Sequence, residues 1–486
     1  MAPAPTTTAD LEKILAAASR SSAAWAATPG SERAVALVAV ADALAAAADE
    51  LVPIAHEETH LPEPRLQFEL GRTTFQLRLF AEVLGAGSYL DVRIDPADPQ
   101  WPMGTPRPDL RRVLEPMGPV VVFAASNFPF AFSVAGGDTA SALAAGCPVV
   151  LKVHSGHPRL SAATGRVVAD ALAAAGAPEG IFSLVFGTEA GRDALTDPRV
   201  KAGSFTGSTA GGRALLDLAG TRVEPIPFYA EMGSVNPTFV TRAATAARRT
   251  EIAEGYLESM TMSAGQLCTK PGVLVVPDDS GIVEELRRLA RPAAARLLND
   301  RIQAGYVEVL GELSSHAAVA TLTEEQGSYD DPPAPTILLT TCEDVLADPT
   351  SLLTECFGPA SLVVTYSDES SLVALAGVLE GQLTATIHGE EGDELHDLVR
   401  ILATRAGRLL WNQWPTGVSV TYAQQHGGPY PATTVSGSTS VGTAAISRFL
   451  RPVAYQNFPQ ALLPKTLRDD NPWGVPRRVD GATAQV

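Results

Sequence analysis

The chain of 486 residues is 45% hydrophobic and 19% charged, a composition typical of a globular protein, and its formal net charge is −18. At this length we expect two or three domains, because a single hydrophobic core stops growing well before such a size. The strong negative charge argues against a nucleic-acid groove or an anionic membrane surface as the partner.

The signals for targeting and redox environment indicate a reduced compartment. Residues 1–30 carry Asp10 and Glu12 and lack a basic flank followed by a long apolar run, so we expect no signal peptide. No stretch approaches the roughly 20 apolar residues of a membrane span. The spacing of the cysteines fits neither a zinc site nor a disulfide framework. These residues are Cys147, Cys268, Cys342 and Cys356. We therefore expect a soluble, cytoplasmic protein.

Two helices are predicted in the N-terminal part of the chain. Apolar residues at helical spacing predict helices at 31–52 and at 64–84. The second helix carries Arg72 and Gln76 at i and i+4, and therefore on one face. Residues 87–116 are rich in Pro, Asp and Arg, and we expect them to form a crossing or linking segment.

Short apolar runs then alternate with helical segments. The runs at 119–124, 147–152 and 181–186 predict buried strands, and the segments at about 133–145 and 158–175 predict helices between them. This alternation is typical of a doubly wound parallel sheet with helices on both faces. A further αβ series from about 234 to 425 indicates a second α/β domain. The tail, 451–486, is expected to be an ordered arm or a loose end.

A glycine-rich turn follows the third strand and leads into a helical run. Residues 204–213 read Ser-Phe-Thr-Gly-Ser-Thr-Ala-Gly-Gly-Arg, which matches neither the dinucleotide fingerprint G-x-G-x-x-G nor the P-loop. Free N–H groups at a helix N-terminus can still hold a phosphate. A plain helix cap is the alternative.

Three segments carry the groups needed for covalent acyl chemistry. Cys268 lies in Gly-Gln-Leu-Cys-Thr-Lys-Pro-Gly, Glu231 follows an apolar run upstream, and Asn127 lies in Ser-Asn-Phe-Pro-Phe. A thiol can attack a carbonyl, an amide can stabilise the oxyanion, and a carboxylate can activate water. Taken singly, each residue has a structural alternative: a buried thiol, a strand-end carboxylate and a turn-forming amide.

The order and spacing of these segments resemble the aldehyde dehydrogenase superfamily. The resemblance implies that Cys268 adds to an aldehyde as a thiolate, and that the Asn127 amide and the Cys268 N–H stabilise the oxyanion. It implies that hydride then leaves to nicotinamide and that Glu231 activates the water that hydrolyses the thioester. No metal is expected, and the scattered histidines are given no role.

The resemblance also implies the cofactor contacts. Lys152 matches a residue that meets the adenosine ribose, and Ser155 stands where NAD-preferring relatives often carry an acid. A carboxylate repels a 2′-phosphate, whereas a serine hydroxyl donates to it, so we expect NADP to be preferred and NAD to be possible. Arg213 is expected to add positive charge. The further contacts implied are Ser126, Gly187, Gly207, Ser208, Gly233, Glu355 and Phe357.

Residues 127–139, 225–237 and 426–434 narrow the resemblance to the α-ketoglutaric semialdehyde dehydrogenase branch. It implies oxidation of 2,5-dioxopentanoate to 2-oxoglutarate; dehydrogenation of long-chain or other aldehydes with NADP is the alternative. The substrate carboxylate needs a buried partner. Arg72 is the first candidate and Lys270 the second, Gln266 is a further substrate contact, and a structural role for Arg72 is the other interpretation.

The fold that the resemblance implies is α/β with a small oligomerisation arm. We expect a Rossmann-type cofactor domain over 1–97 and 117–233 and a catalytic domain over 234–430. Bridging segments are expected at 98–116 and 451–486, with a homodimer or homotetramer as the assembly. A thiol hydrolase or acyltransferase that binds no cofactor is the alternative from another class, because it would use the same Cys, Asn and Glu.

Overall fold

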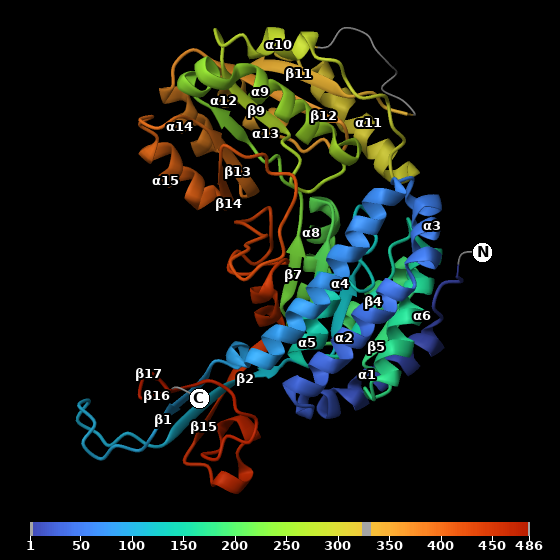
Figure 1. The fold of residues 1–486 in the computed structure, drawn as a ribbon, viewed down its shortest axis with the longest axis vertical. Helices are drawn as coiled ribbons and strands as arrows, with labels where there is room; N and C mark the ends of the chain where they lie inside the picture. The colour runs from blue at the N-terminus through green and yellow to red at the C-terminus, as the bar shows by residue number, and fades with distance from the viewer. Residues whose placement is uncertain (1–2, 323–331, 485–486) are drawn as a thin grey trace.

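The computed structural model describes residues 3–322 and 332–484. Residues 1–2, 323–331 and 485–486 lie outside the described part, and 323–331 falls within the range expected for the catalytic domain. Three separate sheets organise the chain. Two of them form α/β layers stacked along the long axis of the molecule, and the third projects from one end as an arm (Figure 1).

The first sheet is parallel, in the order β5-β4-β3-β6-β7, and it confirms the predicted doubly wound layer. All four side chains of the Val-Val-Val-Phe strand β3 are buried, as expected for a strand covered on both faces. The strands are β3 (Val120–Phe123), β4 (Val149–Lys152), β5 (Phe182–Val185), β6 (Ala202–Thr206) and β7 (Phe228–Glu231). The helices are α5 (Gly137–Ala145), α6 (Pro158–Ala174), α7 (Thr188–Thr196) and α8 (Thr209–Gly220).

Four helices precede this sheet. They are α1 (Thr8–Ala27), α2 (Gly30–Ala46), α3 (Ala48–Thr59) and α4 (Glu63–Ala86). The helix predicted at 64–84 is confirmed as α4, which has Pro at its first turn and ends at Gly87 with φ +68°. The single helix predicted at 31–52 is wrong, because the chain breaks at Ala47 into α2 and α3.

The second sheet has the order β10-β11-β12-β9-β8-β13-β14 and is parallel except for β10. Its strands are β8 (Thr238–Val240), β9 (Val273–Pro277), β10 (Ala320–Thr321), β11 (Thr336–Thr341), β12 (Ala360–Tyr366), β13 (Gln382–His388) and β14 (Ala406–Trp411). Its helices are α9 (Arg242–Thr261), α10 (Ile282–Arg288), α11 (Asp300–Ser315), α12 (Cys342–Ala347), α13 (Pro349–Leu352), α14 (Ser370–Val378) and α15 (His396–Arg405). β9 is the central strand of this sheet, and the loop before it carries Cys268.

The arm is a five-stranded sheet in the order β15-β2-β1-β16-β17. It joins the predicted linking segment to the C-terminal tail, so the tail is an ordered arm over its described residues. The strands are β1 (Val92–Asp95), β2 (Leu110–Pro116), β15 (Leu450–Gln456), β16 (Arg477–Val479) and β17 (Ala482–Ala484). β1 lies within the range expected for the cofactor domain, but it pairs with β2 and β16 of the arm. Among the described helices, none is long and apolar enough to cross a membrane.

Candidate active site

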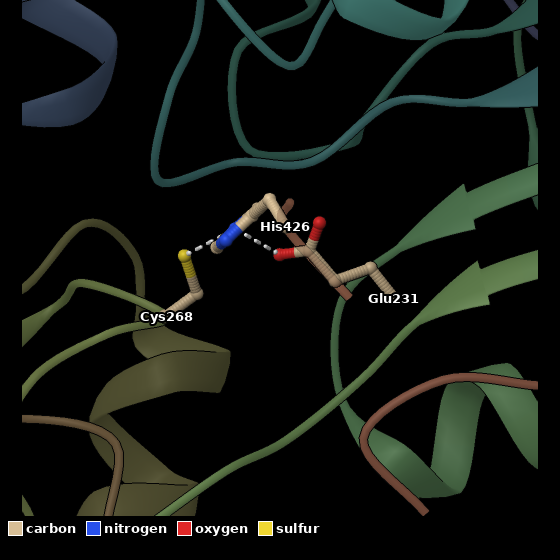
Figure 2. Close-up of side chains that lie close together, drawn as sticks. All are labelled: Glu231, Cys268 and His426. Atoms are coloured by element: carbon tan, nitrogen blue, oxygen red, sulfur yellow. Dashed lines mark hydrogen bonds and ion pairs between the residues drawn. The ribbon is translucent and has the colours of Figure 1, made fainter. Parts of the chain in front are cut away.

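Three side chains from distant parts of the chain meet between the two large sheets (Figure 2). Glu231 is the last residue of β7, at the carboxyl end of a parallel strand, where ligand sites of α/β sheets form. Cys268 lies in the loop between the short helix η2 (Met262–Gly265) and β9, and His426 follows β14. Ser263 and Ala264 have positive φ angles of 52° and 53°, so a tight left-handed turn presents the thiol.

The imidazole of His426 lies between the thiol and the carboxylate. Its Nε2 is 3.4 Å from Cys268 Sγ and 2.9 Å from Glu231 Oε1. Ser440 Oγ donates to Oε2 of Glu231, and both His426 and Glu231 are nearly inaccessible, at 1% and 4% exposure. His426, to which no role was assigned from the sequence, therefore contacts both the predicted nucleophile and the predicted base.

The charges at this site call for a base beside the thiol. Burial raises the pKa of Cys268 well above that of a free thiol, and the carboxylates of Glu231 and Glu355 add to the effect, so the resting sulfur is protonated at neutral pH. Burial also works to raise the pKa of Glu231, but the charge of His426 and hydrogen bonds from His426 and Ser440 outweigh it and lower that pKa. In its neutral form, with the proton on Nδ1, where no described residue accepts it, His426 can take the thiol proton on Nε2. The imidazolium formed in this way donates to Glu231, and it is this charged form that lowers the pKa of the carboxyl group.

Asn127 faces the loop that carries the nucleophile. Its Nδ2 donates one N–H to the carbonyl of Gln266 at 3.2 Å, which leaves the second N–H for an oxyanion on the substrate. The structure thus brings together the three residues that the sequence predicted for acyl chemistry: Cys268, Glu231 and Asn127.

An ion pair on α4 holds the Asn127 segment and the nucleophile loop together. Arg65 donates from Nη2 to the carbonyl of Asn127 at 2.9 Å and from Nε to Ser263 Oγ at 2.9 Å. Its Nη1 is 3.0 Å from Glu69, whose other oxygen accepts from the backbone N–H groups of Phe130 and Ala131 at 2.8 and 2.9 Å. One guanidinium therefore joins both halves of the site.

We expect Arg65→Met to lower kcat by on the order of 10²-fold while KM and cofactor affinity change little, because the amide and the thiol lose their relative placement. Arg65→Lys should recover part of kcat, since it keeps the charge beside Glu69. Steady-state kinetics with thermal unfolding alongside check this. Arg78→Met is the matched control. Arg78 lies on α4, as Arg65 does, but it pairs with the exposed Asp42 of α2, at the protein surface. Parallel losses in kcat, cofactor affinity and melting temperature would assign Arg65 a purely structural role.

Several expected cofactor residues gather at the start of α8. Ser208 caps this helix, accepting from the N–H of Gly211 at 3.2 Å, and Gly207 precedes it. Gly233 donates its N–H to Thr209 Oγ1 at 3.2 Å, and a Cβ on Gly233 would collide with the carboxylate of Glu355. Burial raises the pKa of Glu355 to about 7. A helix N-terminus beside a carboxylate and a glycine without side-chain bulk fits phosphate and ribose groups.

The expected adenosine corner is electropositive. Lys152 ends β4, Ser155 is exposed just beyond it, and α11 brings Arg301 close enough for its charge to lower the pKa of Lys152, an effect to which burial contributes most. Burial above all, and then His157, Lys152 and Arg301, lower the pKa of His154 to about 3. The sequence did not reveal Arg301, because it lies on a helix of the other large domain.

The remaining cofactor predictions have mixed placement. Ser126 and Phe357 are half-buried near Asn127 and Glu355 in sequence, and Gly187 has φ +98° at the N-terminus of α7. Arg213 donates to the hydroxyl of Tyr430 and stacks on its ring, with 5.5 Å between Cζ and the ring centroid. Its partner is therefore Tyr430, and the helix that carries Arg213, α8, follows β6, two strands from the β4 strand of Lys152 in the order of the sheet.

Of the expected substrate residues, the structure supports Arg72. Its Cζ is 5.5 Å from the ring centroid of Phe132, and that ring is 6.3 Å from the ring of His426. Nη2 donates weakly to the carbonyl of Val418 at 3.5 Å, and the buried Nη1 has no hydrogen-bond partner among the described residues. An uncompensated guanidinium N–H close to the imidazole of His426 is suited to an anionic ligand.

The expectation for Lys270 is corrected by its partners. Its ammonium group is 3% exposed and donates to the carbonyls of Cys356, Gly358 and Ala360 at 2.6, 3.1 and 2.5 Å, which uses all three of its N–H bonds. Lys270 thus braces the Glu355 segment and cannot anchor a substrate.

Gln266 is corrected in the same way. Its Nε2 donates to the carbonyl of Ser263 at 3.1 Å, and its Oε1 accepts from the N–H of Leu298 at 2.9 Å. The side chain shapes the nucleophile loop from behind, and only its backbone carbonyl reaches Asn127.

Fold and site together define a thiol enzyme in which a Rossmann-like parallel sheet faces a second α/β domain that carries the nucleophile. The chain belongs to the aldehyde dehydrogenase family, whose sequence pattern matches residues 3–450. It is therefore an oxidoreductase that acts on aldehydes, in a family that uses NAD(P), and both the resemblance and the fold class inferred from the sequence are confirmed.

Individual relatives agree with this assignment. Alpha-ketoglutaric semialdehyde dehydrogenase 2 of Azospirillum brasilense is 44% identical over 97% of this chain and 91% of its own length. Alpha-ketoglutaric semialdehyde dehydrogenase of Acinetobacter baylyi is 43% identical over 90% and 84%. The fold is shared with a 1-pyrroline-5-carboxylate dehydrogenase from Thermus with bound NAD, at TM-score 0.76 and 19% identity over 93% of this chain and 86% of that chain.

Proposed function

We propose that this enzyme oxidises 2,5-dioxopentanoate to 2-oxoglutarate with NADP as its preferred cofactor. The substrate is supported by the two alpha-ketoglutaric semialdehyde dehydrogenases that are 44% and 43% identical to this chain. The observation that carries it is the placement of Arg72, a half-buried cation whose buried Nη1 has no hydrogen-bond partner among the described residues, one aromatic ring away from His426.

Acylation begins with the transfer of the Cys268 proton to Nε2 of His426. The sulfur then bonds to the aldehyde carbon to give a thiohemiacetal, whose oxyanion accepts from the free N–H of Asn127 and from the Cys268 backbone. One such donor contributes roughly 3 kcal/mol. Glu355, Gly233 and the start of α8 would hold a nicotinamide cofactor, which would supply the acceptor for the hydride that this carbon loses, and Cys268 would then carry a thioester.

Deacylation needs a base that removes a proton from water. Glu231 is ionised, held by Ser440, and close to the sulfur through His426, so we assign it this role. Water attacks the thioester carbon while Glu231 takes one of its protons, and the C–S bond breaks to release the carboxylic acid. The imidazolium of His426 returns its proton to the sulfur of Cys268, and Glu231 loses its proton to solvent. A thiol hydrolase could use the same Cys268, Asn127 and Glu231, but it would have no use for Glu355 beside Gly233 at the start of α8.

If Arg72 pairs with the substrate carboxylate, Arg72→Met should lower kcat/KM for 2,5-dioxopentanoate. The activation free energy that kcat/KM reports should rise by roughly 2–5 kcal/mol, the cost of leaving a buried charge unpaired. An uncharged aldehyde of similar length, pentanal, should lose little. Kinetics on the two substrates check this, and a misfolded variant would lose both together. If both fall in parallel, Arg72 is structural and Arg408, which donates to Pro415 and Gly417 of the same segment at 2.7 and 3.2 Å, is the next residue to test.

NADP preference follows from the electropositive corner around Ser155. Ser155→Glu should weaken NADP far more than NAD, because a carboxylate at about 4 Å from the 2′-phosphate costs about 1–4 kcal/mol, depending on the local dielectric. Dissociation constants for both cofactors, measured by fluorescence titration, check this. Equal losses for NADP and NAD would mean that Ser155 does not face the ribose.

We also propose that the first sheet binds the cofactor, the second carries the nucleophile, and the arm joins copies of the chain. The arm projects away from both large domains (Figure 1). It exposes large apolar side chains that contact with a second copy would remove from water, among them Met103, Phe458 and Leu462. Light scattering of the intact protein, with Leu462→Glu as the comparison, tests this assembly.

A further inference from the structure

The catalytic triad, by which we mean Cys268, His426 and Glu231, offers the donor set that zinc prefers. Cys268 supplies a sulfur, His426 a ring nitrogen and Glu231 a carboxylate oxygen, and these ligand atoms all lie within 4.8 Å of one another. In the described part of the chain, this is the one group of three or more such side chains placed so closely. Thiolate, imidazole and carboxylate together select zinc over magnesium and calcium, which prefer sets made only of oxygen ligands.

The separations are close to those of a tetrahedral zinc site. With Zn–S near 2.3 Å and Zn–N and Zn–O near 2.0–2.2 Å, neighbouring ligand atoms lie roughly 3.3–3.6 Å apart. The observed Sγ to Nε2 distance is 3.4 Å, and the Nε2 to Oε1 distance is 2.9 Å. The carboxylate therefore has to move by a few tenths of an ångström from the imidazole. The sulfur and the carboxylate oxygen, which lie on the two sides of that imidazole (Figure 2) and within 4.8 Å of each other, also have to rotate toward one another.

The surroundings already support metal ligands. Ser440 donates to the second oxygen of Glu231, which fixes the carboxylate as an outer hydrogen bond does in zinc proteins. The half-buried Glu355 adds a carboxylate whose field reaches Cys268, whereas Arg72 opposes a cation. Three protein ligands leave one position open, the arrangement of exchangeable rather than structural zinc sites.

We propose that Cys268, His426 and Glu231 form an inhibitory zinc site that excludes the aldehyde. On binding, the S–H bond of Cys268 breaks, its proton leaves to the buffer and a Zn–S bond forms, while Nε2 and Oε1 donate lone pairs. No electron is transferred, so removing the metal restores the enzyme. The inference rests on the proposed reaction only for its activity readout, because the metal site itself depends on the triad.

The test uses the full-length enzyme and zinc chloride alone, with magnesium chloride as the control ion. We expect one zinc ion bound per chain by calorimetry, aldehyde oxidation lost with zinc and regained with EDTA, and alkylation of Cys268 by iodoacetamide slowed at least 10-fold. Cobalt(II) should give the ultraviolet charge-transfer band of a thiolate ligand. Magnesium should do none of this.

Variants then locate the site by binding rather than by activity. His426→Ala and Cys268→Ala should each weaken zinc by at least 10-fold, and His426→Gln serves if the alanine variant does not fold. Cys342→Ser is the matched control, because that buried thiol lies on α12 outside the triad, and it should bind zinc as the wild type does.

Unchanged zinc affinity in the His426 and Cys268 variants, or zinc inhibition without protection of Cys268, would overturn the proposal in favour of surface carboxylates. A wild-type enzyme that fails to oxidise 2,5-dioxopentanoate, yet whose Cys268 is protected by zinc, would leave the zinc site standing and contradict only the proposed substrate.

Discussion

Replacing Cys268 by alanine should abolish aldehyde oxidation, with kcat falling on the order of 10⁴–10⁶-fold, because the change removes the sulfur that lies 3.4 Å from His426 Nε2. Steady-state assays with a semialdehyde and either cofactor measure the loss. Cofactor affinity should stay nearly unchanged, since the start of α8, Glu355 and Lys152 are untouched.

Cys268→Ser makes a sharper comparison with the alanine variant. His426 can accept a proton from a serine hydroxyl, so a small residual rate is expected, but the far higher pKa of the hydroxyl keeps that rate below a few per cent of the wild type. Cys356→Ser is the control for general damage, because that buried thiol faces the carbonyl of Tyr306, at 3.9 Å, and within the described part of the chain makes no hydrogen bond to His426 or Glu231. Substantial activity in Cys268→Ala would mean that the nucleophile is wrongly assigned.

The first sheet was predictable because its strands are short, apolar and buried on both faces, so that β3 and β4 read as uninterrupted valine-rich runs. The N-terminal helices were less so. Alanine-rich sequence keeps helical spacing straight through Ala47, and the break into α2 and α3 is set by packing against α4 and α6 rather than by a Gly or Pro at that point.

The site divides along the same line. Cys268, Glu231 and Asn127 each sit in a recognisable segment, whereas His426 reaches Cys268 from 158 residues away and carries no local chemical signal beyond the run at 426–434. The prediction that Lys270 could bind the substrate carboxylate was wrong because a lysine among polar residues suggests an exposed ammonium group, whereas this one is buried. Three carbonyl groups of the segment that follows Glu355 accept hydrogen bonds from the ammonium group of Lys270, and only the tertiary fold brings them next to it.

Glu231→Gln should separate the two halves of the reaction. With NADP and excess semialdehyde, we expect a burst of reduced cofactor close to one per active site, followed by turnover slowed roughly 10²–10⁴-fold, because an amide cannot take a proton from water. Stopped-flow absorbance measures both phases. The burst itself should be somewhat slower than in the wild type, since glutamine accepts from the imidazolium of His426 without neutralising its charge.

His426→Gln gives the matched comparison, because it removes the proton acceptor next to the sulfur and leaves the carboxylate in place. Here the burst phase should become the slow step, by roughly 10²–10⁴-fold, so burst and steady state merge into one rate. The raised pKa of Cys268 sets the sign of a second readout. Without His426, the alkylation rate of the thiol should be low at neutral pH. It should keep rising at pH values above the range in which a free thiol ionises, because the pKa of Cys268 is raised. If Glu231→Gln instead loses its burst and His426→Gln keeps it, the roles reverse: the carboxylate would then be the group that activates the thiol, and the imidazole the one that delivers water to the thioester.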